Sequence, residues 1–248
     1  MINKKGELTT TQIVMIIVLI VSFIVILYFF YRLNLGATSN SEICHNSVVL
    51  QSKSAKIAPG GLQCKTDYIC ISGGGKCSDM NPTVTLTVDP ADKNAVMKAI
   101  ADQMVNCWYE FGEGKLNYIG ISDKDPLPVT NCAICSTIGF DNTISSQNYH
   151  ITYSDFYNFL MNTKKDNSQT YLQYLYGVSD ISTLQSENPV AKDMLNNNLA
   201  MSQKYAISTG FYSGAVWGLF KNRVIYPDPV TINQISSELK CSNFITQA

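Results

Sequence analysis

The chain has 248 residues, of which 46% are hydrophobic and 15% are charged, and its formal net charge at pH 7 is −1. No long basic stretch is present, which excludes the class of nucleic-acid-binding proteins that depend on a basic face. The length is sufficient to bury a hydrophobic core, so the composition indicates a folded protein without a nucleic-acid partner.

The first predicted element is a long apolar helix near the N-terminus. All 24 residues of Leu8–Tyr31 are uncharged. At ~1.5 Å per residue this helix is about 36 Å long, enough to cross the ~30 Å hydrocarbon layer of a membrane. Lys4 and Lys5 precede it, whereas only Arg32 follows it closely. We therefore predict a cytoplasmic N-terminus and a C-terminal domain outside the cytoplasm.

Two other N-terminal signals compete with an uncleaved signal-anchor. A secretory signal normally has an apolar region of ~7–15 residues and a small-residue cleavage site. The apolar run here is longer, and Leu35-Gly36-Ala37 is a poor cleavage site. Lys4-Lys5-Gly6-Glu7 resembles a class III, prepilin-type signal, although such signals usually carry glutamate where this chain has Thr11. A pilin-like filament subunit, processed after the glycine, stays open as an alternative.

We expect the chain to divide into four parts. Residues 1–7 form a cytoplasmic stub, residues 8–32 cross the lipid bilayer, residues 33–43 form a tether and residues 44–248 form a Cys-rich extracytoplasmic domain. The tether is assigned because its sequence is small and polar. This division places most of the chain at the cell surface or in the envelope.

All eight cysteines follow the apolar segment. An even number confined to the exported side fits a disulfide framework, because disulfides persist in oxidising compartments. The spacing lacks the close cysteine pairs of a zinc ribbon, so we predict no metal site and no cofactor. The predicted disulfide cysteines are Cys44, Cys64, Cys70, Cys77, Cys107, Cys132, Cys135 and Cys241.

The first half of this domain contains the clearest soluble helix. A weak helical pattern covers residues 44–56, and alternating residues predict a strand over Val84–Val88. Asp89 can then cap a helix whose first residue is Pro90. Apolar residues recur in this helix at spacings of three and four, and two glycines end it. They are Val96, Ile100, Met104, Cys107, Trp108 and Phe111, followed by Gly112 and Gly114.

The second half mixes further strands and helices. Thr152 and Asp155 form a capping box that opens a helix over residues 153–163, with Phe156, Phe159 and Leu160 facing inward. Because the elements do not alternate regularly as strand, helix and strand, we predict an α+β fold. The other predicted strands cover residues 116–121, 133–140, 205–212 and 215–226, and further helices are predicted from Asn188-Pro189 and over residues 231–240.

The stretch Cys107-Trp-Tyr-Glu-Phe-Gly-Glu-Gly-Lys115, followed by Cys132-Ala-Ile-Cys135, is the most distinctive in the chain. Together with Cys44, Tyr171–Gly177 and Cys241, it resembles a group of uncharacterised, single-pass, cysteine-rich membrane proteins of archaeal type. The resemblance implies a shared fold and compartment. It implies no catalytic residue, because the group has no assigned activity.

Cys132-x-x-Cys135 is the sharpest chemical motif. In thioredoxin-like enzymes this motif lies at a helix N-terminus, which lowers the pKa of the attacking thiol. Here the residues that follow it, Ser136–Phe140, predict a strand. Structural disulfides are therefore the favoured interpretation, and a membrane-tethered thiol–disulfide oxidoreductase using Cys132 and Cys135 is the alternative.

Other catalytic motifs are scarce. The only histidines are His45 and His150, and neither a Gly-x-Ser-x-Gly nor a His-Glu-x-x-His motif occurs. Nine tyrosines between Tyr149 and Tyr226 suggest a binding surface, although a position bordering the core is the favoured interpretation. We therefore expect a non-enzymatic cell-surface or envelope-complex component that binds a protein partner or ligand. The sequence leaves open the partner, the disulfide connectivity and whether the chain forms oligomers.

Overall fold

The computed structural model of the chain describes residues 10–32, 40–54, 62–118, 129–147, 149–187, 195, 197–213, 223–231, 241 and 243–245. The chain divides into two compact units, Met1–Ser39 and Asn40–Ala248. In the first unit, helix α1 (Thr10–Arg32) exposes a series of apolar side chains from Ile13 onward. Within the described residues, no helix meets both the length and the apolarity that crossing a membrane requires. The predicted transmembrane span therefore stays a prediction.

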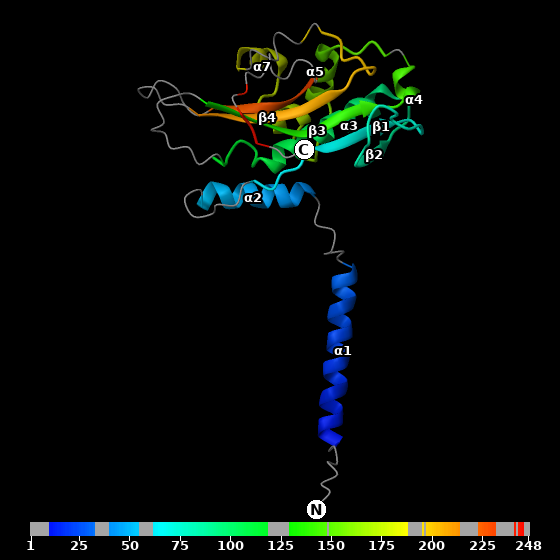
Figure 1. Cartoon of the computed structure of the whole chain (residues 1–248), viewed down its shortest axis with the longest axis vertical. Coiled ribbons are helices and arrows are strands. Elements are labelled where there is room, and N and C mark those ends of the chain that lie inside the picture. The colour runs from blue at the N-terminus through cyan, green and yellow to red at the C-terminus, as the bar shows by residue number, and fades with distance from the viewer. Residues whose placement is uncertain are drawn as a thin grey trace, which may run out of the picture. The chain divides into compact units, whose positions relative to one another are not determined.

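The second unit is built on a six-stranded mixed sheet. The order is β2-β1-β3-β4-β5, with β1 parallel to β2 and β3, and β4 antiparallel to β3 and β5. The short β6 pairs with the first half of β3, whereas β1 pairs with its second half. Figure 1 shows β3 and β4 running side by side through the domain. The strands are β1 (Asp67–Ser72), β2 (Val84–Thr87), β3 (Val129–Phe140), β4 (Tyr205–Ser213), β5 (Arg223–Thr231) and β6 (Asn243–Phe244).

Six helices of the described chain accompany the sheet, which confirms the α+β class. The long helix α3 is the central one, because it contacts β3, β4 and β5 as well as α2, α5 and α6. The helices are α2 (Asn40–Ser54), α3 (Lys93–Glu110), α4 (Asn142–Ser145), α5 (Tyr153–Asn162), α6 (Tyr171–Tyr176) and α7 (Ile181–Glu187). Helix α2 begins at Asn40, so the last residues assigned to the tether are helical.

The apolar face predicted for α3 is confirmed, since all six of its predicted core residues are buried. The predicted start was wrong by one turn. Asp89 accepts a hydrogen bond from the Ala91 N–H (2.9 Å), which forms a turn, and the helix begins only after Asp92. Asp92 accepts from the Asn94 N–H (2.8 Å) and is the N-cap. Gly112 and Gly114 end the helix with positive φ, as predicted.

The remaining predictions have mixed outcomes. The capping box of Thr152 and Asp155 is confirmed at the start of α5, as are the strands predicted over residues 133–140 and 205–212. A second capping box, Thr170 with Gln173, opens α6 and was not predicted. Of the strand predicted over residues 215–226, residues 223–226 belong to β5, and residues 215–222 lie outside the described residues. Residues 116–118 form no strand, and the predicted segments 119–121, 188–190 and 232–240 lie outside the described residues.

The tyrosines of the C-terminal half contribute mainly to the core. Tyr153, Tyr157, Tyr171, Tyr176 and Tyr205 are each at most 3% exposed. The pairs Tyr157–Tyr176 and Phe140–Tyr205 pack edge to face. These five tyrosines therefore stabilise the interior of the domain.

Candidate functional site

All eight cysteines form disulfides, so the predicted framework is confirmed and no thiol is free. One disulfide, Cys107–Cys135, joins α3 to the central strand, and another, Cys132–Cys241, joins this strand to the C-terminal segment. Cys44–Cys64 secures α2 and Cys70–Cys77 closes the loop after β1. These links hold α2, α3 and the sheet as one covalently connected scaffold.

The Cys132-x-x-Cys135 motif lies on a strand, which explains its pairing. Successive side chains of a strand point to opposite faces, so residues three apart point apart. Cys135, at a bulge in β3, points to the face covered by α3 and pairs with Cys107. Cys132 packs with Ala206 on the other face. The oxidoreductase alternative therefore lacks both a free thiol and the Cys132–Cys135 disulfide that it needs.

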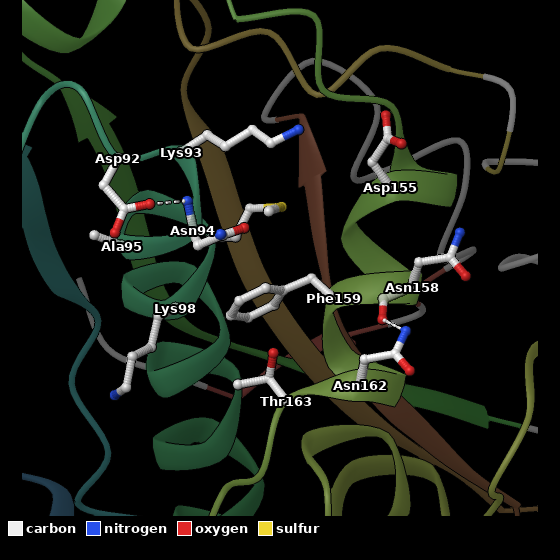
Figure 2. Close-up of a pocket in the computed structure, with 11 residues that line it drawn as sticks. Asp92, Lys93, Asn94, Ala95, Lys98, Asp155, Asn158, Phe159, Asn162 and Thr163 are labelled. Carbon is white, nitrogen blue, oxygen red and sulfur yellow. Dashed lines mark hydrogen bonds between the residues drawn. The ribbon is translucent and has the colours of Figure 1, made fainter.

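A groove of about 640 Å³ lies between α3 and α5, and we call it the α3–α5 groove. Figure 2 shows the first turns of α3 on one side and the whole of α5 on the other. Both walls are fixed, because α3 lies on the sheet and is covalently joined to β3, and α5 contacts α3. The lining residues are Asp92, Lys93, Asn94, Ala95, Met97, Lys98, Asp155, Asn158, Phe159, Asn162 and Thr163.

Phe159 provides the aromatic surface of the groove. Its ring projects from α5 toward α3 (Figure 2) and stacks on Tyr171, with ring centroids 6.3 Å apart. Phe156 and Leu160 are fully buried, as predicted, whereas Phe159 is only half-buried. The difference arises because three residues along a helix leave Phe159 about 60° around the axis from Phe156. A side chain predicted as core thus lies at the border between core and groove.

The two carboxylates of the groove accept hydrogen bonds at the starts of α3 and α5. Asp92 caps α3, and Asp155 accepts hydrogen bonds from the N–H (2.9 Å) and hydroxyl (2.8 Å) of Thr152. These hydrogen bonds, together with the positive charge of Lys93, hold the pKa of Asp155 below its usual value. Lys98 forms an ion pair with Asp102 (2.8 Å). The lining therefore has two acidic and two basic residues and balanced charge.

A second, smaller pocket of about 400 Å³ lies where α3 ends, beside α6. Here Glu113, at φ 54°, binds Lys115 and accepts a hydrogen bond from the Tyr174 hydroxyl (2.7 Å). These two partners lower the pKa of Glu113. Lys165 lies 4.1 Å from the centre of the Tyr174 ring. The charges of this pocket are thus satisfied internally, and the conspicuous Gly-Glu-Gly-Lys sequence serves as a helix end.

Asp141 is a buried carboxylate with five hydrogen-bond donors, and no sequence pattern indicated it. It is 1% exposed, caps α4, and accepts hydrogen bonds from the N–H groups of Gly73 (3.1 Å) and Gly75 (2.7 Å). Burial raises its pKa, but the hydrogen bonds prevail and lower it to about 2. Further donors to this carboxylate are the Ser72 and Thr143 hydroxyls and the Ile144 N–H. Gly73 and Gly75 thus form the backbone cradle of a buried carboxylate, while the Gly74 N–H donates to the Ser72 hydroxyl.

Glu110 is a second buried carboxyl group, located where α2, α3 and β1 meet. It is 7% exposed. Burial raises its pKa to about 7, opposed by a hydrogen bond from Ser41 and reinforced by the negative charge of Asp67. The neighbouring Tyr109 stacks on His45, whose Nδ1 lies 2.6 Å from the Tyr109 carbonyl oxygen. His45 thus has a structural position, and neither it nor the exposed His150 lines the groove.

The described part of the chain contains no group of three or more His, Cys, Asp or Glu side chains arranged to hold a metal ion. The α3–α5 groove therefore offers amides, a hydroxyl, an aromatic ring and balanced charges for recognition. No protein-family model matches the chain, and no curated protein or solved structure is similar to it.

Proposed function

We propose that the chain is a single-pass membrane protein that presents a disulfide-stabilised, non-enzymatic binding domain outside the cytoplasm, at the cell surface or in an envelope complex. Its ligand or partner binds in the α3–α5 groove. Residues 8–32 anchor the chain in the membrane, with the N-terminus in the cytoplasm.

The groove is the observation that carries the binding role. Ligand sites usually have volumes of ~300–1,000 Å³ and combine apolar surface with a few polar groups. The α3–α5 groove has about 640 Å³, an aromatic ring and polar residues from two helices. Its walls are joined by helix packing and, through Cys107–Cys135, to the sheet. A rigid site of this kind loses little conformational entropy on binding.

The compartment is supported by the cysteines and by the N-terminal sequence. Four disulfides with no remaining thiol fit an oxidising environment. The 24 uncharged residues of Leu8–Tyr31, preceded by two lysines, fit an anchor with a cytoplasmic N-terminus. These two features are independent of each other, and both favour a domain outside the cytoplasm.

Photo-crosslinking in the native cells tests this function. A photo-reactive amino acid replaces Asn94, which is exposed on α3 and lines the groove, or Asn46, which is exposed on α2 and does not. We expect an adduct from position 94 of the full chain and none from position 46. The proposal fails if neither position gives an adduct, or if both positions give the same one.

A further inference from the structure

The two aspartates and two lysines that line the α3–α5 groove balance, so the groove has no net charge with which to select a charged ligand. Lys98 is paired with Asp102, and the carboxylates of Asp92 and Asp155 accept hydrogen bonds at the starts of α3 and α5. Lys93 has Asp155 as its oppositely charged neighbour. An anion in the groove would meet two carboxylates and a cation two ammonium groups, so the groove favours a neutral ligand.

The hydrogen-bonding groups that remain include the side-chain amides of Asn94 and Asn158 and the hydroxyl of Thr163. Figure 2 shows Asn94 on α3 and Thr163 at the end of α5, on either side of the Phe159 ring. Within the described residues, neither side chain forms a hydrogen bond with another residue. An amide donates and accepts, and so does a hydroxyl. Hydroxyl groups at separate positions of a ligand, each of which also donates and accepts, match this arrangement.

The Phe159 ring supplies the apolar part of the site. Tyr171 stacks against it, and its remaining exposed surface lies in the groove. The face of an aromatic ring is electron-rich and attracts groups with partial positive charge. The C–H face of a pyranose is such a group, and it is apolar while the hydroxyls at its edge are polar. One ring with polar groups beside it therefore fits a sugar.

The walls of the groove disfavour a peptide. All its lining residues, within the described chain, belong to α3, to α5 or to the residues directly beside them, so no strand edge is available for an added strand. A helical peptide needs apolar contacts at several successive turns. The groove offers only Phe159 and the buried Met97 as large apolar side chains.

We infer that the α3–α5 groove binds a neutral oligosaccharide, an inference that rests on the proposed binding function. The lining of α5 from Asp155 to Thr163 extends about 12 Å along the helix axis, which is longer than a single pyranose ring. The groove is therefore long enough for more than one sugar residue.

Binding to defined oligosaccharides tests this inference. The full chain, reconstituted in lipid nanodiscs, is titrated by calorimetry with neutral hexasaccharides of glucose, mannose and N-acetylglucosamine. A hexasaccharide of galacturonic acid serves as the charged counterpart, and a library of extended peptides serves as the alternative ligand. We expect a neutral hexasaccharide to bind with a Kd of about 1 mM or tighter, and the charged one at least tenfold more weakly.

Three variants assign the binding to the groove. Phe159→Leu keeps apolar volume but removes the ring, and should weaken binding about threefold to tenfold. Asn94→Ala should weaken it about twofold to tenfold, while the control Asn46→Ala, also an exposed helical asparagine, leaves it unchanged. Asn94→Ala removes only an exposed side chain, so it stays informative if Phe159→Leu fails to fold.

The outcomes separate this inference from the function on which it rests. A neutral hexasaccharide that binds in a manner sensitive to Asn94 supports both. A peptide that binds in the same sensitive manner, without any saccharide, overturns the inference and leaves the proposed function standing. Binding of no probe, or binding that both groove variants leave unchanged, overturns the oligosaccharide inference, and the photo-crosslink at position 94 then decides the function.

Discussion

The most direct test of the folding argument is the variant Asp141→Asn. The wild-type carboxylate accepts hydrogen bonds from Gly73, Gly75 and Ile144 N–H groups and has a pKa of about 2, compared with an ordinary value of 3.8. At ~1.4 kcal/mol per pH unit, this difference corresponds to about 2.4 kcal/mol of stability at neutral pH. An asparagine places an NH₂ donor among these donors and leaves at least one of them unsatisfied.

We therefore expect Asp141→Asn to lower the free energy of unfolding by about 2–3 kcal/mol at pH 7. For a domain of this size such a loss lowers Tm by about 4–12 °C. The measurement is thermal and guanidinium unfolding of the oxidised full chain in detergent. Asp180→Asn is the matched control, because Asp180 also accepts from a helix N–H (Thr183, 2.8 Å) but is exposed. Its variant should lose much less stability.

The pH dependence gives the decisive sign. Because the pKa of Asp141 is lowered in the folded state, its contribution is present above about pH 4 and is lost as the pH falls toward 2. The difference between wild type and Asp141→Asn should shrink by about 1 kcal/mol between pH 7 and pH 3. The reasoning is refuted if this difference is independent of pH, or if Asp141→Asn costs no more than Asp180→Asn.

Three further predictions concern the rest of the domain. The pKa of Glu110 is raised to about 7, so the stability of the wild type should fall as the pH rises from about 4.5 to 7. Glu110→Gln should be more stable than the wild type by up to about 3 kcal/mol at pH 8 but not at pH 4. Equal pH profiles of the two proteins in denaturant titrations would contradict this. Gly177→Ala should lower the stability to thermal unfolding by about 1 kcal/mol. Only backbone strain acts there, because φ is +72° and an added Cβ meets no atom within 4 Å. Gly74→Ala, at φ +116° in a loop, is the comparison variant. Replacing Cys132 and Cys241 by alanine opens a loop with a sequence separation of 109 and should cost about 5 kcal/mol by chain entropy; unchanged denaturation midpoints would show that this disulfide adds nothing.

Local patterns predicted much of the fold. The spacing of apolar residues in α3 and the Thr152 capping box of α5 are short-range features, and both are confirmed. The predicted start of α3 was wrong because Asp89 and Asp92 each accept a hydrogen bond from an N–H group two residues later. Asp89 forms an isolated turn, whereas Asp92 caps the helix. Such a choice between two equivalent caps depends on contacts beyond the helix itself.

The candidate site depended on long-range geometry that no local pattern contains. Phe159 follows the spacing of a core residue, but it faces α3, which begins more than sixty residues earlier in the chain. Likewise, the partners of Cys132 and Cys135 follow from the opposite faces of β3 and could not be chosen from spacing alone. Asp141 and Gly73 lie 68 residues apart in the sequence, so the glycine-rich loop could be predicted as a turn but not as a carboxylate cradle.

The central claim is that an oxidised, rigid domain lies outside the cytoplasm and carries the α3–α5 groove. Non-reducing peptide mapping tests it most directly, on the full chain isolated from native cells whose free thiols are first blocked by alkylation. The account predicts no alkylated cysteine and four linked peptide pairs, Cys44–Cys64, Cys70–Cys77, Cys107–Cys135 and Cys132–Cys241. Alkylated cysteines, or a Cys132–Cys135 link, would contradict both the compartment and the scaffold that holds the groove.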